Sequence, residues 1–180
     1  MHYIQQLWPD HVIRTMVEEH EVILANLKRL RQLVGEICQE DRLVDLTLLK
    51  TIAGNLLAAE PHHQREENVL FLELEELGIE GPPTVMRMEH VELRKLKHDF
   101  AELSEQADEL ELEAFKSRLK RTALSLVGML EEHIEKENQI LYPCALAEIE
   151  EDTWKTMQTA CEAIGPCDFK PMRETVSQSP

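Results

Sequence analysis

Apolar residues recur every three or four positions along several long stretches of the chain, as they do on one face of an α-helix. The clearest stripe lies in the second half and reads Leu119, Ala123, Leu126, Leu130, His133, Glu137, Ile140 and Cys144. His133 and Glu137 therefore stand where leucines belong, facing the interior. Burying a charged carboxylate costs several kcal/mol or more unless another group pairs with it. The stripe thus predicts a metal ion bound between helices.

The same periodicity predicts five helices, over His11–Gln39, Asp45–Leu77, Thr84–Leu112, Glu113–Glu148 and Asp152–Ile164. Gly78 is a favoured helix stop, and Gly81-Pro82-Pro83 is read as a firm break. Pro61 and Pro143 fall inside helical patterns and are expected to kink them. A turn is predicted at Asp41–Leu43, and a mobile tail from Phe169 onward.

Long helices with short connections favour an all-α fold, an antiparallel up-and-down four-helix bundle with an additional C-terminal helix. We expect residues 1–150 to form the bundle and residues 151–180 to form the last helix and tail. The last helix is expected to cover one bundle end or to mediate a homodimer.

Composition narrows the class of protein. The formal net charge of −16 argues against a nucleic-acid partner, because phosphates need a basic surface. The chain contains no run of eighteen apolar residues and no signal-peptide pattern, so we expect a cytoplasmic protein with no membrane partner. The four cysteines form no CxxC pair and are read as reduced thiols, which argues against a zinc ribbon.

Each predicted bundle helix carries a histidine on or beside its apolar face. These candidate ligands are His20, His63, His90 and His133, and Glu67 and Glu137 each follow one of them by four residues. Imidazole with carboxylate suits iron, and also manganese or zinc. The remaining histidines, His2, His11, His62 and His98, are expected to be solvent-facing or terminal.

The second helix leaves its ligands open, because His62-His63 and Glu66-Glu67 are both doublets. On a continuous α-helix, His63 and Glu67 lie about 20° and 60° from Leu70 around the axis, and this position favours them. His62 and Glu66 stay as alternates. Glu60 and Glu89 also lie on apolar stripes and are read as extra ligands or as partners of the ligands.

These motifs resemble the hemerythrin-like, or HHE cation-binding, family. The resemblance is carried by Glu19-His20, by the segments from His62 to Phe71 and from Val85 to His90, and by the segment from His133 to Pro143. It is closest to a bacterial and archaeal subgroup with the linker Glu-Leu-Gly-Ile-Glu-Gly-Pro-Pro. In that subgroup the histidine matching His62 is the favoured one, and a histidine matches His11.

The resemblance implies a four-helix bundle with two non-haem iron ions. His20 and the second helix's histidine would serve one iron, His90 and His133 the other, and Glu67 and Glu137 would bridge them. Binding or sensing of O2, response to nitric oxide, and iron handling are the implied roles.

Two departures from the oxygen-carrying members argue against reversible oxygen carriage. Met86 and Arg94 stand one turn on either side of His90, where those members have a second histidine, and Asn138 replaces their aspartate.

Nothing in the sequence indicates a substrate pocket, which favours binding or sensing over catalysis. A ferritin-like oxidase needs a Glu-x-x-His on two helices, and Leu130 removes it from the fourth. The alternative to a di-iron protein is a helical interaction module, or a protein holding one zinc ion.

Overall fold

The computed structural model describes residues 4–39 and 46–172, and these residues form helices and connections with no strand among them. The predicted turn at Asp41–Leu43 lies outside the described residues. In chain order the elements are η1 (Ile4–Gln6), α1 (Val12–Gln39), α2 (Leu46–Ala58), α3 (Glu60–Arg65), η2 (Glu66–Leu70), α4 (Phe71–Glu76), α5 (Gly81–Glu105), η3 (Gln106–Asp108), α6 (Leu112–Lys136), η4 (Glu137–Leu141), α7 (Tyr142–Glu148) and α8 (Glu151–Ile164). The all-helical prediction is confirmed.

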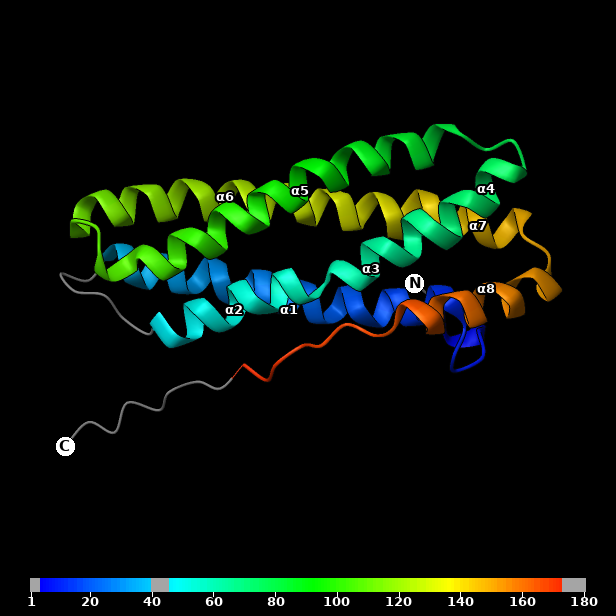
Figure 1. The fold of residues 1–180 in the computed structure, drawn as a ribbon, viewed down its shortest axis with the longest axis horizontal. Coiled ribbons are helices and arrows are strands. Elements are labelled where there is room, and N and C mark those ends of the chain that lie inside the picture. Colours follow the sequence, from blue (N-terminus) through cyan, green and yellow to red (C-terminus); the bar gives the residue numbers. More distant parts are fainter. Residues whose placement is uncertain (1–3, 40–45, 173–180) are drawn as a thin grey trace.

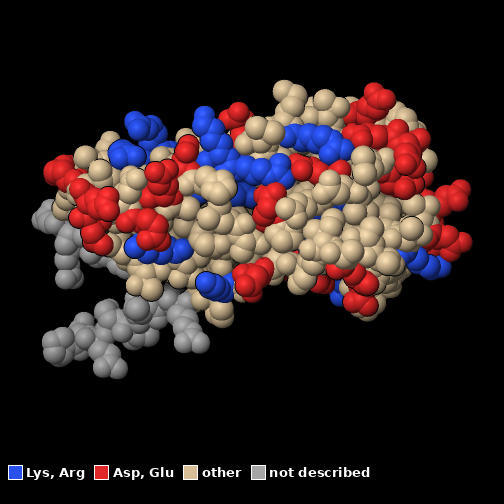
Figure 2. Space-filling view, in the orientation of Figure 1, with Lys and Arg blue, Asp and Glu red and all other residues tan. Residues whose placement is uncertain are grey.

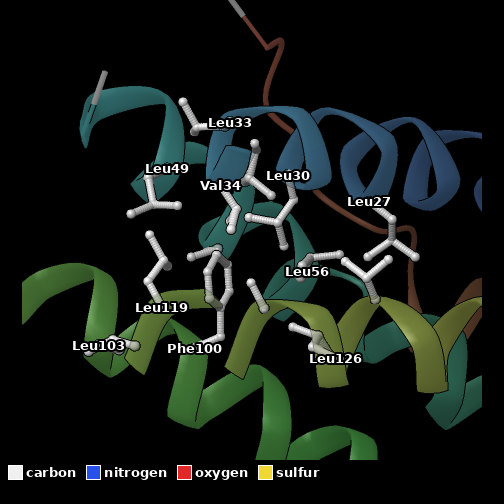
Figure 3. Packing of buried hydrophobic residues seen from close by; sticks show 14 of the residues in the cluster. Leu27, Leu30, Leu33, Val34, Leu49, Leu56, Phe100, Leu103, Leu119 and Leu126 are labelled. Carbon is white, nitrogen blue, oxygen red and sulfur yellow. The ribbon is translucent and has the colours of Figure 1, made fainter. Parts of the chain in front are cut away.

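The long helices pack side by side, as Figure 1 shows. Helix α1 contacts α2 and α6, and α5 contacts the same two helices, so the four close a ring around a common interior. Figure 3 shows side chains from all four helices, among them Leu30, Leu49 and Leu119, gathered around Phe100. This core fills one end of the bundle with aliphatic groups.

A second apolar cluster fills the other end, and α8 belongs to it. Trp154 and Met157 of α8 are buried together with Val12 and Ile13 of α1 and Tyr142 of α7. The histidine and glutamate stripes lie between the two apolar clusters.

Two of the predicted helices contain interruptions beside their prolines. Ala59 leaves helical geometry, and Pro61 then lies in the first turn of α3, where its missing N–H costs nothing. Pro143 lies in the first turn of α7, directly after the π-helical η4. A second π-helical stretch, η2, follows α3. Pro61 thus follows a break between two α-helices at Ala59, and Pro143 follows a change from π-helix to α-helix. The kinks expected at both prolines stay predictions.

The remaining boundaries follow local chemistry. Gly78 stops α4 with φ of +81°, as predicted. Helix α5 begins at Gly81, earlier than predicted, because Pro82 and Pro83 fit a first helical turn and do not break the helix. Helix α6 begins where the Glu111 carboxylate accepts a hydrogen bond from the Ala114 N–H at 3.0 Å.

The surface is strongly acidic, but its charges are not evenly spread. In Figure 2, acidic side chains gather toward both ends of the visible face, and a row of Lys and Arg lies between them. No helix in the described part of the chain is long and apolar enough to cross a membrane.

Candidate metal centre

Seven ionisable side chains meet inside the bundle between its two apolar clusters. They come from all four sides of the bundle, namely α1, the α3–η2 segment, α5 and the α6–η4 segment. The seven residues are His20, His62, His63, Glu66, His90, His133 and Glu137. Each has at most 2% of its surface exposed. Ionisable groups are almost never buried so completely unless something pairs with them.

Both buried glutamates lie where an α-helix gives way to a π-helical stretch. Glu66 is the first residue of η2 and Glu137 is the first residue of η4. Each glutamate follows a buried histidine by four residues, His62 or His133. The two His-x-x-x-Glu pairs take equivalent places in the structure, and the pair that matches His133 and Glu137 is His62 with Glu66, not the His63 with Glu67 that the spacing favoured.

This register differs from the one predicted for a continuous α-helix. A π-turn holds an extra residue, so each residue turns the chain by less than the 100° of an α-helix, and four residues accumulate an offset of roughly 70°. Counted back from Leu70 through η2, the offset carries Glu67 to more than about 100° from Leu70 and leaves Glu66 within about 40° of it. Glu66 is fully buried, whereas the Glu67 side chain is 18% exposed.

The first half of the cluster joins α1 to α3. The Nε2 atoms of His20 and His62 lie 3.0 Å apart. One oxygen of Glu137 lies 3.1 Å from His20 Nε2, and one oxygen of Glu66 lies 3.6 Å from His62 Nε2.

The second half joins α5 to α6 with the same geometry. The Nε2 atoms of His90 and His133 lie 3.0 Å apart. The other Glu137 oxygen lies 2.7 Å from His133 Nε2, and Glu66 Oε2 lies 3.3 Å from His90 Nε2. Both carboxylates therefore span the two histidine pairs.

His63 adds a fifth imidazole on the side of the second pair. Its ring stacks on His90 with centroids 4.0 Å apart, and ring nitrogens of His63, His90 and His133 lie within 4.8 Å of one another. Burial, and then the charge of Lys97, lower the pKa of His63 well below its usual range. His63 is consequently neutral, as a metal ligand must be.

The outward nitrogens of the paired histidines are each held by an oxygen. Nδ1 donates to Asn138 from His20 (3.1 Å), to Glu19 from His62 (2.8 Å), to Glu67 from His90 (2.8 Å) and to Glu89 from His133 (2.8 Å). Three of these oxygens belong to carboxylates that also accept from a base: Arg65 binds Glu19, Arg94 binds Glu67 and Lys136 binds Glu89. Such outer contacts fix the tautomer that turns Nε2 inward, the usual arrangement around a metal-ligating histidine.

The other acidic candidates therefore lie outside the cluster. Burial alone would raise the pKa of Glu67, but hydrogen bonds from His90 and Arg94 lower it to about 2. Glu89 occupies the equivalent place behind His133. Glu60 accepts from Arg94 at 2.9 Å, and its carboxylate lies 3.9 Å from His63 Nδ1. Arg94, read as a departure from the family pattern, orients Glu67.

Each facing pair of Nε2 atoms requires a positive charge between its nitrogens. With both Nδ1 atoms donating outward, two neutral imidazoles would point lone pairs at each other across 3.0 Å. Burial opposes charge on these rings, yet the buried carboxylates raise the pKa of His20 and His133 and bring that of His90 to about 10. The site therefore favours cationic charge, supplied by protons or by metal ions.

Unsatisfied oxygens support the metal. Glu66 Oε2 and both oxygens of Glu137 accept no hydrogen bond, although imidazole nitrogens lie 2.7 to 3.8 Å from them. Buried carboxylate oxygens of this kind are costly unless a cation binds them. Five imidazoles with two carboxylates form a donor set that suits iron, manganese or zinc.

Tyr142 was not anticipated from the sequence as part of the site. Its hydroxyl donates to Glu66 Oε1 at 2.7 Å and lies 3.4 Å from His20 Nε2. Burial, and then the charge of Glu66, raise the pKa of Tyr142 well above its usual value, so the phenol stays protonated. Tyr142 follows Glu137 by five residues, and this spacing indicates that both face the site only once η4 is known to be π-helical.

Comparison with known proteins agrees with this geometry. The family model described as Hemerythrin HHE cation binding domain matches residues 11–145, the part of the chain that contains all seven side chains. A search of curated proteins gave no match.

Proposed function

The chain belongs to the hemerythrin HHE cation-binding domain family, and we propose that its buried cluster holds two non-haem iron ions. One observation carries the proposal: two pairs of inward Nε2 atoms are spanned by the same two carboxylates. Two carboxylates shared between two nitrogen pairs are typical of two metal ions: Glu137 turns one oxygen to each pair, and Glu66 Oε2 lies within 3.6 Å of an Nε2 atom of each pair. The antiparallel up-and-down order of the bundle helices belongs to the same proposal.

We assign one ion to His20 and His62 and the other to His63, His90 and His133, with Glu66 and Glu137 shared between them. This assignment uses both members of the histidine doublet. It also replaces the second histidine that α5 lacks, because His63 lies on the His90 side. Glu67 and Glu89 then orient ligands and bind no ion themselves.

The two irons would supply redox chemistry and affinity for small diatomic ligands. The chain's own residues would hold the ions; they exclude bulk water by burial and keep a protonated phenol beside the Glu66 oxygen. These features support a role in oxygen, redox or nitric oxide sensing, or in iron handling. The buried position of all seven donors favours sensing or storage over turnover of a large substrate.

Metal analysis of the aerobically purified protein, together with its optical spectrum, tests the proposal. We expect two iron ions per chain and near-ultraviolet charge-transfer bands of a di-iron centre. A single zinc ion per chain, or a fully folded protein that binds no metal, would overturn it and leave a zinc protein or a helical interaction module.

A further inference from the structure

Residues 165–172 leave α8 and run back along the bundle, past the junction of α2 and α3 (Figure 1). We call these residues the strap. Gly165 turns the chain at the end of α8 with φ of +94°, a conformation that favours glycine. The strap has no helical periodicity, so its contacts were not predictable from the sequence.

The far end of the strap is fixed to the bundle. The Lys170 N–H donates to Asn55 Oδ1 at 2.7 Å, and the Asn55 amide donates back to the Lys170 carbonyl at 2.9 Å. Phe169 and Met172 pack against the apolar core. These residues fall inside the tail predicted to be mobile, and the rest of that tail lies outside the described residues.

The near end of the strap contacts the metal site through one arginine. Arg65 donates to the Gly165 carbonyl and, at 3.7 Å, to Cys167 Sγ. The same guanidinium donates to Glu19, which accepts from His62 Nδ1 at 2.8 Å. Three contacts therefore connect the strap to a proposed ligand.

Only one half of the site has this connection. The carboxylates behind His90 and His133 are held by Arg94 of α5 and Lys136 of α6, which are bundle residues. The strap contributes nothing to them among the contacts that the structure describes.

Gly165 and Pro166 of the strap also line a surface pocket of about 290 Å³ between α1 and α8. Arg65 and Cys161 line the same pocket. The near end of the strap therefore borders open space at Gly165 and Pro166.

We propose that the strap controls how firmly the His20–His62 half retains its metal ion. Docked, it holds Arg65 and Glu19 so that His62 keeps its orientation. Lifted, it frees Arg65 and weakens that half alone, so that one ion is released while the other stays. The inference rests on the proposed function and adds a regulatory element to it.

The test compares two shortened chains, loaded with two Fe2+ per chain without oxygen and then mixed with excess chelator. One chain ends at Ile164 and lacks the strap. The matched control ends at Met172 and keeps it. We expect the Ile164 form to lose one ion at least about tenfold faster than the control, while the slower ion's rate changes less than about twofold, because outer contacts typically contribute 10- to 100-fold to metal affinity.

Two full-length variants keep the test decisive if the shortened chain folds poorly. Arg65→Lys retains the positive charge but loses the branched guanidinium that joins the strap to Glu19. It should accelerate release of the ion from the His20–His62 half. Glu89→Gln should accelerate release of the ion from the His90–His133 half. Unchanged release, or equal acceleration of both ions by strap removal and by Arg65→Lys, overturns the strap's role and leaves the di-iron proposal standing. A full chain that never retains two ions overturns both.

Discussion

Glu66 and Glu67 are neighbours with identical side chains, yet the fold gives them opposite environments. Glu66 is fully buried with an oxygen that accepts no hydrogen bond, and Glu67 is partly exposed between His90 and Arg94. Replacing each glutamate by the neutral glutamine therefore distinguishes a carboxylate that binds both metal ions from one that only orients a histidine.

We expect Glu66→Gln to reduce the bound metal below two ions per chain, because the neutral amide lacks the negative charge that the carboxylate shares between two cations. Glu67→Gln should keep two ions and weaken their retention by about 10- to 100-fold. Metal content after dialysis, followed by chelator competition, measures both effects. Loss of an ion from Glu67→Gln with full retention by Glu66→Gln would return the ligand role to Glu67.

His11 shows where single-residue reasoning from the sequence was wrong. Expected to be solvent-facing or terminal, it is buried between Trp8 and Trp154, and its Nδ1 accepts from the Ile13 N–H at 3.1 Å. It thus caps the start of α1. Its partner Trp154 lies far away in the sequence, so helical periodicity could not reveal the contact.

The His11 cap predicts a loss of stability in acid. Burial lowers the pKa of His11 to about 4 from the usual 6.5, so the unfolded chain binds this proton first. Its contribution is complete above pH 6.5 and is lost as the pH falls toward 4, by up to about 3 kcal/mol. His11→Asn, which can cap but cannot titrate there, should lack this part of the slope in urea unfolding of chelator-treated protein. His98→Asn, at an exposed position, should keep it; equal slopes in all three proteins would refute the assignment.

Among the elements, the continuous helices were the predictable ones. In α1, α5 and α6 a single α-helical phase runs through His20, His90 and His133, so periodicity alone turned them inward. The α2–α4 region failed the same reasoning, because the break at Ala59 and the π-helical η2 change the phase between Leu56 and Leu70. The π-helical turn lets Glu66 contact residues of other helices, and the local hydrophobic pattern contains no signal for such contacts.

Helix α8 is packed into the apolar cluster at one bundle end. The predicted division at residue 150 can therefore be tested by asking whether α8 unfolds together with the bundle. We expect Trp154→Ala to destabilise the protein by about 3–5 kcal/mol, because the side chain is 3% exposed and its loss opens a cavity. Met88→Ala, at an exposed apolar position of α5, should change stability by less than about 0.5 kcal/mol. Denaturant unfolding measures both; a mild effect of Trp154→Ala, or a separate transition for α8, would mark α8 as an independent appendage.

The whole molecule adds a long-range field to these local contacts. A net charge of −16 should attract metal cations, so their association rate should fall with ionic strength, by on the order of tenfold from low to high salt. Stopped-flow mixing with Co2+ measures the rate. A rate independent of salt would show that opening of the bundle, not diffusion, limits loading. The predicted homodimer stays a prediction.

Anomalous X-ray scattering at the iron edge from crystals of the iron-loaded protein tests the central claim most directly. We expect two peaks separated by about 3.5–4 Å, one beside His20 and His62 and one beside His90 and His133, with Glu66 and Glu137 between them. A single peak, a peak at the zinc edge only, or metal bound at Glu67 outside the cluster would contradict the account.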